Sequence, residues 1–568
     1  MEPVAAATPV LDADTKRYIV KTVVRWSPLL AAALTLALVV SLAPPVPSSS
    51  SGSGARRAAT AAGSAGGGSS TTVVAGVAGA AGGAGTGGGG SSGASGGAQG
   101  TAAASNLTRS GLVCKPGVRQ VAWSVYAPQC VPAFHGNNGG ATSHGITSST
   151  ITISYREPNS TQQSAAQSLA GNAFPDDNGL IADMQTYIRY FNSQYELYGR
   201  KVQMVPYQGQ GDYLAEDEGQ DLAAAQADAQ SAYDEGAFAD LTFPLFGSQY
   251  YEQDLAQASV VGIGGLGFPT QWYQQYAPYE YSVTPTGTAG ADGFVNIACD
   301  RMAGLPAIYA GDPTYQTQAR KFGFIGPDNP EYSAVGDLVQ NGLLKTCGVT
   351  LAKRVSYAID VASFEQQAVS IVAQMKQAGV TTVICGCDPL FPILLYQAAD
   401  QQQYDPEWLG IGWYDPQGRL PAQDQMAHMM SQEGQFPQPS QTEAYKVFQL
   451  ADPGGTPAEQ YYLVAYYSVL YLFDSLQASG PHLTPGTFQQ GVFSMGRSPN
   501  GDVGTWQGGI GAFSPSLTTQ IGWWNPNATS NFDGGKGAWE SCEQGRWFTF
   551  LDPNAWQPNH TQLGCFGH

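Results

Sequence analysis

Apolar residues in the central stretch 321–400 follow two alternating periods. A short apolar run at 321–325 breaks into a loop rich in Gly and Pro, and apolar side chains then recur with helical spacing. A second helical pattern leads into the β-branched run 380–384, and residues 386–389 begin the next helix. This alternation predicts a parallel sheet covered by helices on both faces, with the loops after the strands at one carboxyl edge. A ligand is expected to bind at that edge.

The same alternation extends over most of the chain. Further strands are predicted at 151–155, 201–207, 239–245, 260–263 and 408–411, and helices at 180–195, 222–235, 249–258 and 287–302. The chain is expected to cross from one sheet to another near the extended segment 279–285. The apolar helix 461–478 has the length of a membrane span, but Asp474, Gln477 and its repeated Tyr residues favour a core helix. The tail 501–565 predicts short strands and turns.

Residues 1–43 have the pattern of an export signal. Basic residues within 1–26 precede an apolar run at 28–43, so the N-terminus is expected inside the cell and everything after the run outside. The run fits both a cleaved signal peptide and a retained signal anchor helix. The protein is therefore expected to be extracytoplasmic, either secreted or anchored to the cell membrane by one N-terminal helix. Residues 44–105 are mostly Gly, Ser, Ala and Thr, which predicts a disordered linker.

Composition and charge restrict the function classes. At 568 residues the chain is long enough for two or three domains with their own cores. The net charge of −19 and the lack of a long basic run argue against a nucleic-acid partner. Outside the Gly- and Ser-rich linker 44–105, the sequence contains no GxSxG, HExxH, P-loop or paired-carboxylate motif, so no catalytic residue and no cofactor are predicted, and the protein is expected not to be an enzyme.

The eight cysteines suit an oxidising compartment. Pairing by sequence neighbourhood favours three disulfides, which join Cys114 with Cys130, Cys299 with Cys347, and Cys542 with Cys565. A bond between Cys385 and Cys387 would close a small strained ring, so free thiols are the alternative for these two. Zinc is a competing use, but the Cys385-Gly-Cys387 spacing is not that of a CxxC half-site, and no metal site is predicted.

Five segments follow one another along the chain in an order and spacing that are typical of one protein family. They are the strand at Ile151, the segment 192–205, the loop 244–248, the segment 281–285 and the strand–helix unit 321–399. This order resembles the type 1 periplasmic binding proteins, specifically the branched-chain amino acid (Leu/Ile/Val) binding family. The stretch 138–142 is similar to the lead-in of exported actinobacterial members of that family. The resemblance covers residues 130–548 and implies an α/β clamshell of two lobes, each a parallel sheet with helices on both faces.

The resemblance also implies how the chain is divided. Residues 106–149 form a disulfide-stapled lead-in, 150–290 form lobe 1, 291–450 form lobe 2, and 451–568 return to lobe 1 and add closing strands. Several crossing segments form the hinge, and the ligand is trapped in the cleft when the lobes close on it.

The family's binding positions fall at the strand ends of lobe 1. Ser248, followed by Gln249, stands where the family holds the ligand carboxylate with a hydroxyl and a backbone N–H at a helix N-terminus; a helix cap explains Ser248 equally well. Gly265, Gly267 and Phe268 match the next binding loop. Family members commonly carry a Thr near the place of Gly267, so a side-chain donor is missing here.

Lobe 2 supplies the other predicted binding residues. Tyr332 aligns with an aromatic residue of the family's cleft, and Tyr414 and Asp415 follow the last strand of the lobe. Amino acid binders carry an acid for the ligand's ammonium group at the position that Leu390 occupies here. Asp388 lies two residues away and either replaces that acid or caps its helix. Because the aligned acid is missing, the identity of the ligand stays open.

The resemblance implies a solute-binding protein that traps a small polar or amphipathic, amino-acid-like ligand. Its partner is then the membrane permease of an ABC-type uptake system. The alternative is a membrane-anchored extracellular sensor or adaptor with the same clamshell. Both functions take a small-molecule ligand and neither involves nucleic acid.

Overall fold

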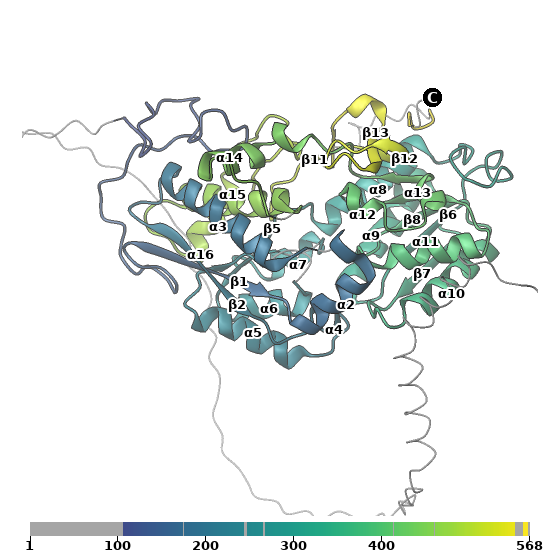
Figure 1. The fold of residues 1–568 in the computed structure, drawn as a ribbon, viewed down its shortest axis with the longest axis horizontal. Coiled ribbons are helices and arrows are strands. Elements are labelled where there is room, and N and C mark those ends of the chain that lie inside the picture. The colour runs from purple at the N-terminus through teal and green to yellow at the C-terminus, as the bar shows by residue number, and fades with distance from the viewer. Residues whose placement is uncertain are drawn as a thin grey trace, which may run out of the picture. The chain divides into compact units, whose positions relative to one another are not determined.

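The computed structural model describes residues 106–173, 175–242, 247–264, 267–412, 414–458, 460–550 and 561–565 (Figure 1). The predicted export segment 1–43 and the linker 44–105 lie outside the described residues. The stretch Gln99–His568 forms one compact unit. Across the described ranges, no helix is both long and apolar enough to cross a membrane.

Lobe 1 is built on a parallel sheet. Its strands lie in the order β2-β1-β3-β4-β5, and their bounds are β1 Thr150–Glu157, β2 Lys201–Gln208, β3 Ala239–Asp240, β4 Val261–Gly264 and β5 Glu280–Ser282. On β1, Ile153 and Tyr155 are buried on one face and Ser154 and Arg156 on the other, as expected for a strand covered on both faces. The helices that connect these strands are α2 Ser160–Ala170, η1 Gly171–Ala173, α3 Asp177–Gln194, α4 Tyr213–Asp217, α5 Leu222–Asp234, α6 Gln249–Gln257 and α7 Thr270–Gln275.

Lobe 2 is built on a mixed sheet with the order β13-β12-β10-β9-β8-β6-β7. The strands β6 Phe322–Pro327, β7 Lys353–Tyr357, β8 Thr382–Cys385, β9 Glu407–Gly410 and β10 Met429–Ser431 are parallel. The tail adds β12 Gly522–Thr529 and β13 Lys536–Ser541, which run antiparallel at the β10 edge. The predicted parallel sheet is present, and the antiparallel hairpin from the tail extends it at the β10 edge. The helices of this lobe are α8 Gly287–Arg301, α9 Pro330–Cys347, α10 Phe364–Gln377, α11 Phe391–Gln401, α12 Asp415–Gly418 and α13 Gln423–Met426.

The chain passes between the lobes at 283–286, at 432–442 and at 514–521, counting only the part that the structure describes. After the second crossing, α14 Glu443–Ala451 and α15 Tyr462–Ser479 pack on α3, and α16 Pro485–Phe493 packs on α15 (Figure 1). The remaining short elements are η2 Pro439–Gln441, β11 Thr518–Thr519, η3 Glu543–Gly545 and β14 Phe548–Thr549; β11 pairs with β14. Several crossings give both lobes a shared hinge, as the sequence predicts.

Helix α15 is a core helix, which confirms the prediction made from its sequence. Its side chains are buried on all sides, and Leu470 is fully inaccessible. The polar groups are paired inside the core: the Tyr195 hydroxyl donates to the Asp474 carboxylate at 2.7 Å, and the Glu196 N–H donates to the Gln477 side-chain oxygen at 3.0 Å. The polar residues that argued against a membrane span thus bind α15 to the end of α3.

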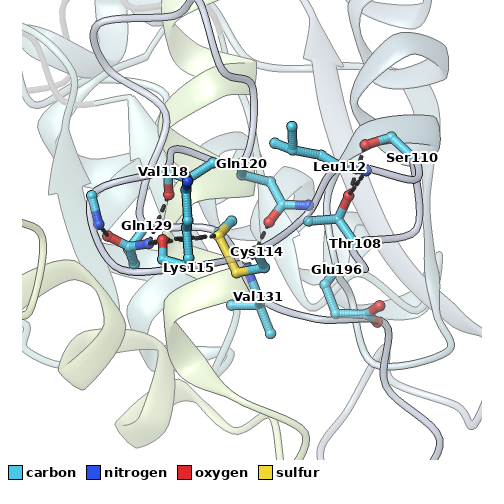
Figure 2. The surroundings of a disulfide bond; sticks show 12 residues. Thr108, Ser110, Leu112, Cys114, Lys115, Val118, Gln120, Gln129, Val131 and Glu196 are labelled. Carbon is cyan, nitrogen blue, oxygen red and sulfur yellow. Dashed lines mark hydrogen bonds between the residues drawn. A yellow bond between two sulfur atoms is a disulfide. The ribbon is translucent and has the colours of Figure 1, made fainter. Parts of the chain in front are cut away.

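The three disulfides expected from sequence neighbourhood form in the structure. Cys114–Cys130 closes the lead-in loop shown in Figure 2, where the Gln129 amide nitrogen also donates to the Lys115 and Val118 carbonyls at 2.9 and 2.7 Å. The bond holds a segment that has almost no regular secondary structure of its own.

The alternative of free thiols at Cys385 and Cys387 is wrong, because the structure joins these residues by a disulfide. Their Cα atoms are 5.1 Å apart, which lies within the range that a disulfide spans. The chain turns as it leaves β8, and this brings the two side chains together across Gly386. The bond lies directly before Asp388 and so holds the start of the loop that carries this predicted binding residue.

Two acidic side chains are buried side by side in lobe 1. Glu280 on β5 and Glu252 on α6 are 0% and 1% exposed, and a Cβ at Gly262 would lie 2.5 Å from Glu280 Oε2 and 2.6 Å from Glu252 Oε2. A larger residue at this position would therefore displace the two carboxyl groups. Burial, and then the neighbouring Glu252, raise the pKa of the Glu280 carboxyl well above its ordinary value.

This buried pair predicts that stability falls as the pH rises. A raised pKa means that the folded chain holds a proton that the unfolded chain releases, so the contribution is complete below the ordinary glutamate pKa and is lost as the pH rises through the folded pKa. Glu280→Gln keeps the shape and removes the charge. We expect the melting temperature of the wild type to fall from pH 5 to pH 8 and that of Glu280→Gln to fall less. Parallel pH dependences of the two proteins would contradict this prediction.

Candidate functional site

A cavity of about 430 Å³ lies between the two lobes. This volume is in the range of sites for small molecules. Lobe 1 contributes Tyr213, Asp217 and Gly267, and lobe 2 contributes Tyr332 and Asp388. All the crossings described above also line it, through residues that include Thr284, Glu433, Phe436 and Thr518. A molecule bound here would contact both lobes and the hinge.

Four of the predicted binding residues line this cavity: Gly267, Tyr332, Asp388 and Tyr414. The other described candidates, which are Ser248, Gln249, Phe268 and Asp415, are buried and lie outside its lining. Gly265 lies outside the described residues. Phe268 nevertheless reaches the cleft indirectly, since its ring packs against Tyr332 of lobe 2 at a centroid distance of 5.8 Å.

Ser248 is the N-cap of α6. Its hydroxyl accepts a hydrogen bond from the Tyr251 N–H at 3.1 Å and donates to Glu216 Oε2 at 2.6 Å. The side chain is fully buried, so the structure uses it in the way that the capping alternative describes. The backbone N–H of the next residue, Gln249, donates to Asp217 Oδ1 at 3.3 Å.

A buried charge network supports helix α4 beneath the cavity. The Arg156 guanidinium pairs with Glu216 and Asp228, and its Nη2 atom lies 2.8 Å from Asp228 Oδ2. All these side chains are 2% exposed or less. The guanidinium also lies over the Tyr251 ring, 4.3 Å from its centroid. Because Glu216 immediately precedes Asp217 in α4, this network fixes the position of a cavity carboxylate.

Asp388 both lines the cavity and caps α11. Its Oδ1 atom accepts from the N–H groups of Leu390 and Phe391 at 2.7 and 3.1 Å, and Oδ2 accepts from the Tyr357 hydroxyl at 2.6 Å. Burial raises the pKa of this carboxyl, against these hydrogen bonds, which lower it. The sequence left open whether Asp388 caps the helix or lines the binding site, and one side chain can do both.

Asp415 joins two elements of lobe 2. Its carboxylate accepts from the Ser530 hydroxyl at 2.5 Å and from the Trp539 N–H at 3.0 Å, which attaches α12 to the hairpin of β12 and β13. Next to it, the Tyr414 ring does line the cavity, and it packs against Phe436 and Tyr461 at centroid distances of 4.9 and 5.1 Å.

Several residues of the cavity wall carry no motif in the sequence that marks them as binding residues. Asp217 lies in the acidic run 216–218, which carries no recognisable motif, and Glu433 lies in a crossing segment that no periodic pattern marks. Tyr467 comes from α15, whose uniform apolarity predicts burial and not which side chains face a cavity. For Asp217, the run of acidic residues at 216–218 was the one feature of the sequence that could have indicated a binding residue.

The ionisable groups of the described cavity wall are acidic. Asp217, Asp388, Glu433 and Asp502 line it, and none of its described residues is Lys, Arg or His. Burial raises the pKa of Asp217 well above its ordinary value; the Gln249 N–H opposes this and the neighbouring acids, including Asp388, add to it. Glu433 is exposed to the cavity but lies deep within the protein, which raises the pKa of its carboxyl to about 7.

The lobes touch each other at one side of the cavity. Directly after α4, the Glu218 side chain of lobe 1 accepts a hydrogen bond from the Ile359 N–H in the loop that follows β7 of lobe 2. Together with the Phe268–Tyr332 contact, this bond joins the two walls of the cleft.

No family model matches this chain, and no curated protein matches its sequence. Among solved structures, it is similar to a fatty acid ABC transporter substrate-binding protein from Thermomonospora curvata, with 12% identity, a TM-score of 0.50, and coverage of 75% of this chain and 98% of that one. It is also similar to a leucine-, isoleucine-, valine-, threonine- and alanine-binding protein from Brucella ovis (13%, TM-score 0.47, coverage 71% and 96%). A third structure is a solute-binding protein of an ABC transporter from Rhodopseudomonas palustris in complex with p-hydroxybenzoic acid (12%, TM-score 0.48, coverage 71% and 98%). At such identities the likeness concerns the fold, and the chain has the two-lobed α/β fold of the type 1 periplasmic binding proteins.

Proposed function

We propose that this protein is an extracytoplasmic solute-binding protein that traps a small ligand between its lobes. The observation that carries the proposal is the cavity, whose wall is made by both lobes and by the hinge crossings. A ligand that contacts both walls binds the closed arrangement more tightly than the open one, and therefore shifts the population toward closure. This is the physical requirement for a protein that signals occupancy to a partner.

We further propose that the partner is the membrane permease of an ABC-type uptake system. The similar structure from Thermomonospora curvata is described as an ABC transporter substrate-binding protein, which supports this assignment by analogy of fold. The predicted export signal agrees with a protein that works outside the cytoplasm, either free or held by its N-terminal segment.

The proposed ligand is a small, amphipathic, amino-acid-like molecule. The aromatic rings of Tyr332, Tyr414 and Tyr467 offer flat apolar surface, and Asp388 offers a carboxylate for an ammonium group. Asp388 thus takes the place of the acid that is missing at Leu390, although it approaches from a different position in the loop.

A thermal-shift screen of the purified chain tests this function. Amino acids, amides, amines, sugars and short peptides are added singly, and the melting temperature is measured. A ligand at 100 times its dissociation constant is expected to add about 2.7 kcal/mol to the free energy of unfolding. If no solute in any of these classes raises the melting temperature, the solute-binding proposal fails.

A further inference from the structure

We propose that the ligand is a cation, an organic amine without a free carboxylate, and that Asp217 of lobe 1 and Asp388 of lobe 2 hold its ammonium group from opposite walls of the cleft. This inference rests on the proposed solute-binding function and specifies the substrate class of the same cavity. It departs from a zwitterionic amino acid, which carries an anionic group that must also find partners.

The cavity wall offers negative charge and no positive charge. Its described carboxyl groups belong to Asp217, Asp388, Glu433 and Asp502, and none of its described lining residues is Lys, Arg or His. A ligand carboxylate placed here would lose its water, face acidic groups and find no cation in the described wall, which is strongly unfavourable. An ammonium group would meet opposite charge on both sides.

Two carboxyl groups from different lobes line the same cavity. Asp217 is carried by α4 of lobe 1, and Asp388 by the loop after β8 of lobe 2. Both carboxylates interact electrostatically with the same two tyrosines, Tyr213 of lobe 1 and Tyr332 of lobe 2. Burial raises the pKa of both tyrosine hydroxyls, and the negative charge of the two carboxylates raises it further. Burial raises the pKa of both carboxyl groups, so the empty cleft favours their uncharged forms, whereas a cation between them favours the charged carboxylates. The loaded cleft thereby gains charge-assisted hydrogen bonds to the ammonium group that the empty cleft lacks.

Asp217 retains hydrogen-bonding capacity for a ligand. This side chain is 6% exposed, and its bond from the Gln249 N–H is 3.3 Å long, which is longer than the usual 2.9–3.0 Å for such bonds. A carboxylate accepts several hydrogen bonds. A primary ammonium group has three donors and can satisfy Asp217 and Asp388 together.

An independent observation at the cavity wall is the indole of Trp506. The residue is 3% exposed and lines the cavity, and its ring N–H is buried without a hydrogen-bond partner in the described structure. An indole N–H only donates, and a buried donor is normally paired. The ligand is therefore expected to carry a neutral acceptor, such as an amide carbonyl or a hydroxyl, in addition to its ammonium group.

Charge-matched sets of probes test the inference in the wild-type chain at pH 7. The set with an aromatic side chain consists of phenylalanine amide, phenylalanine and 3-phenylpropionate. The set with an aliphatic side chain consists of leucine amide, leucine and 4-methylpentanoate. Dissociation constants are measured by calorimetry alongside the solute screen. We expect the amides, which are cations, to bind at least about tenfold more tightly than the zwitterions, and the carboxylates not to bind.

Two variants locate the ammonium site. Asp217→Asn and Asp388→Asn are each expected to weaken binding of the preferred amine by about 30-fold or more, since one partner of a buried charge pair is lost. Glu235→Gln serves as the control, because Glu235 is an exposed acid at the end of α5 and lies outside the cavity wall. It is expected to bind like the wild type.

The outcomes separate this inference from the function on which it rests. If the zwitterions or carboxylates bind as tightly as the amides, or if the solutes that the screen finds are anions, the inference is overturned while solute binding stands. Unchanged affinity in Asp217→Asn overturns the role of that residue. If neither the probes nor the broader screen yields a ligand, the solute-binding function itself fails. If the variants do not fold, the relative affinities of the wild-type chain for the amides, zwitterions and carboxylates still test whether the ligand is a cation.

Discussion

Replacement of Arg156 by methionine is expected to lower the free energy of unfolding by about 3–5 kcal/mol. The variant leaves Glu216 and Asp228 buried without their cation, and both carboxylates are 1% exposed or less. The loss is measured by urea unfolding with linear extrapolation. The same variant should also weaken ligand binding, because Glu216 holds the Ser248 cap and fixes the start of the segment that carries Asp217.

The control for this experiment is Arg354→Met. Arg354 pairs with Asp337 at the surface, where the two side chains are 22% and 63% exposed, so its loss is expected to cost about 1 kcal/mol or less. A similar, small loss in Arg156→Met would show that the buried network does not stabilise lobe 1. A large loss of stability without any change in affinity would remove the link between the network and the cavity.

Replacement of Arg320 by methionine in lobe 2 is expected to cost a similar 3–5 kcal/mol, but without a change in ligand affinity. Arg320 Nε lies 2.7 Å from Glu407 Oε2, and both side chains are 0% exposed. Glu407 also accepts from the Tyr309 N–H and the Thr382 hydroxyl at 2.9 and 2.8 Å. Neither Arg320 nor Glu407 belongs to the described cavity wall.

The pair of variants therefore separates stability from binding. Affinity is measured by calorimetry at a temperature where both variants are folded. If Arg320→Met weakened binding as much as Arg156→Met, the effect on the ligand would reflect general destabilisation and not the position of α4.

The sequence predicts most of the architecture, because the spacing of apolar residues within each helix or strand can be read from a short stretch of chain, and the order of the elements follows directly. The alternation in 321–400 corresponds to β6, β8 and their helices, and the polar residues of 461–478 correctly identify a core helix. The antiparallel hairpin at the β10 edge was missed, since the pairing of β12 with β10 joins segments far apart in the sequence. The bond between Cys385 and Cys387 depends on a turn after β8 that spacing alone does not reveal.

The candidate site was less predictable than the fold. Tyr332 and Asp388 follow strand ends and were found by that rule, and the structure places both at the cavity. Ser248 follows the same rule, but its hydroxyl is turned to Glu216 inside lobe 1. Asp217 and Trp506 reach the cavity through tertiary packing of segments without a motif, so no local pattern could have marked them.

The decisive measurement is the structure of the chain in complex with the tightest ligand from the screen. We expect a ligand within the cavity of about 430 Å³ that contacts Tyr332 or Asp388 on lobe 2 and Asp217 on lobe 1 in the same molecule. A ligand bound to one lobe alone, or on the outer surface with the cavity empty, would contradict the clamshell function.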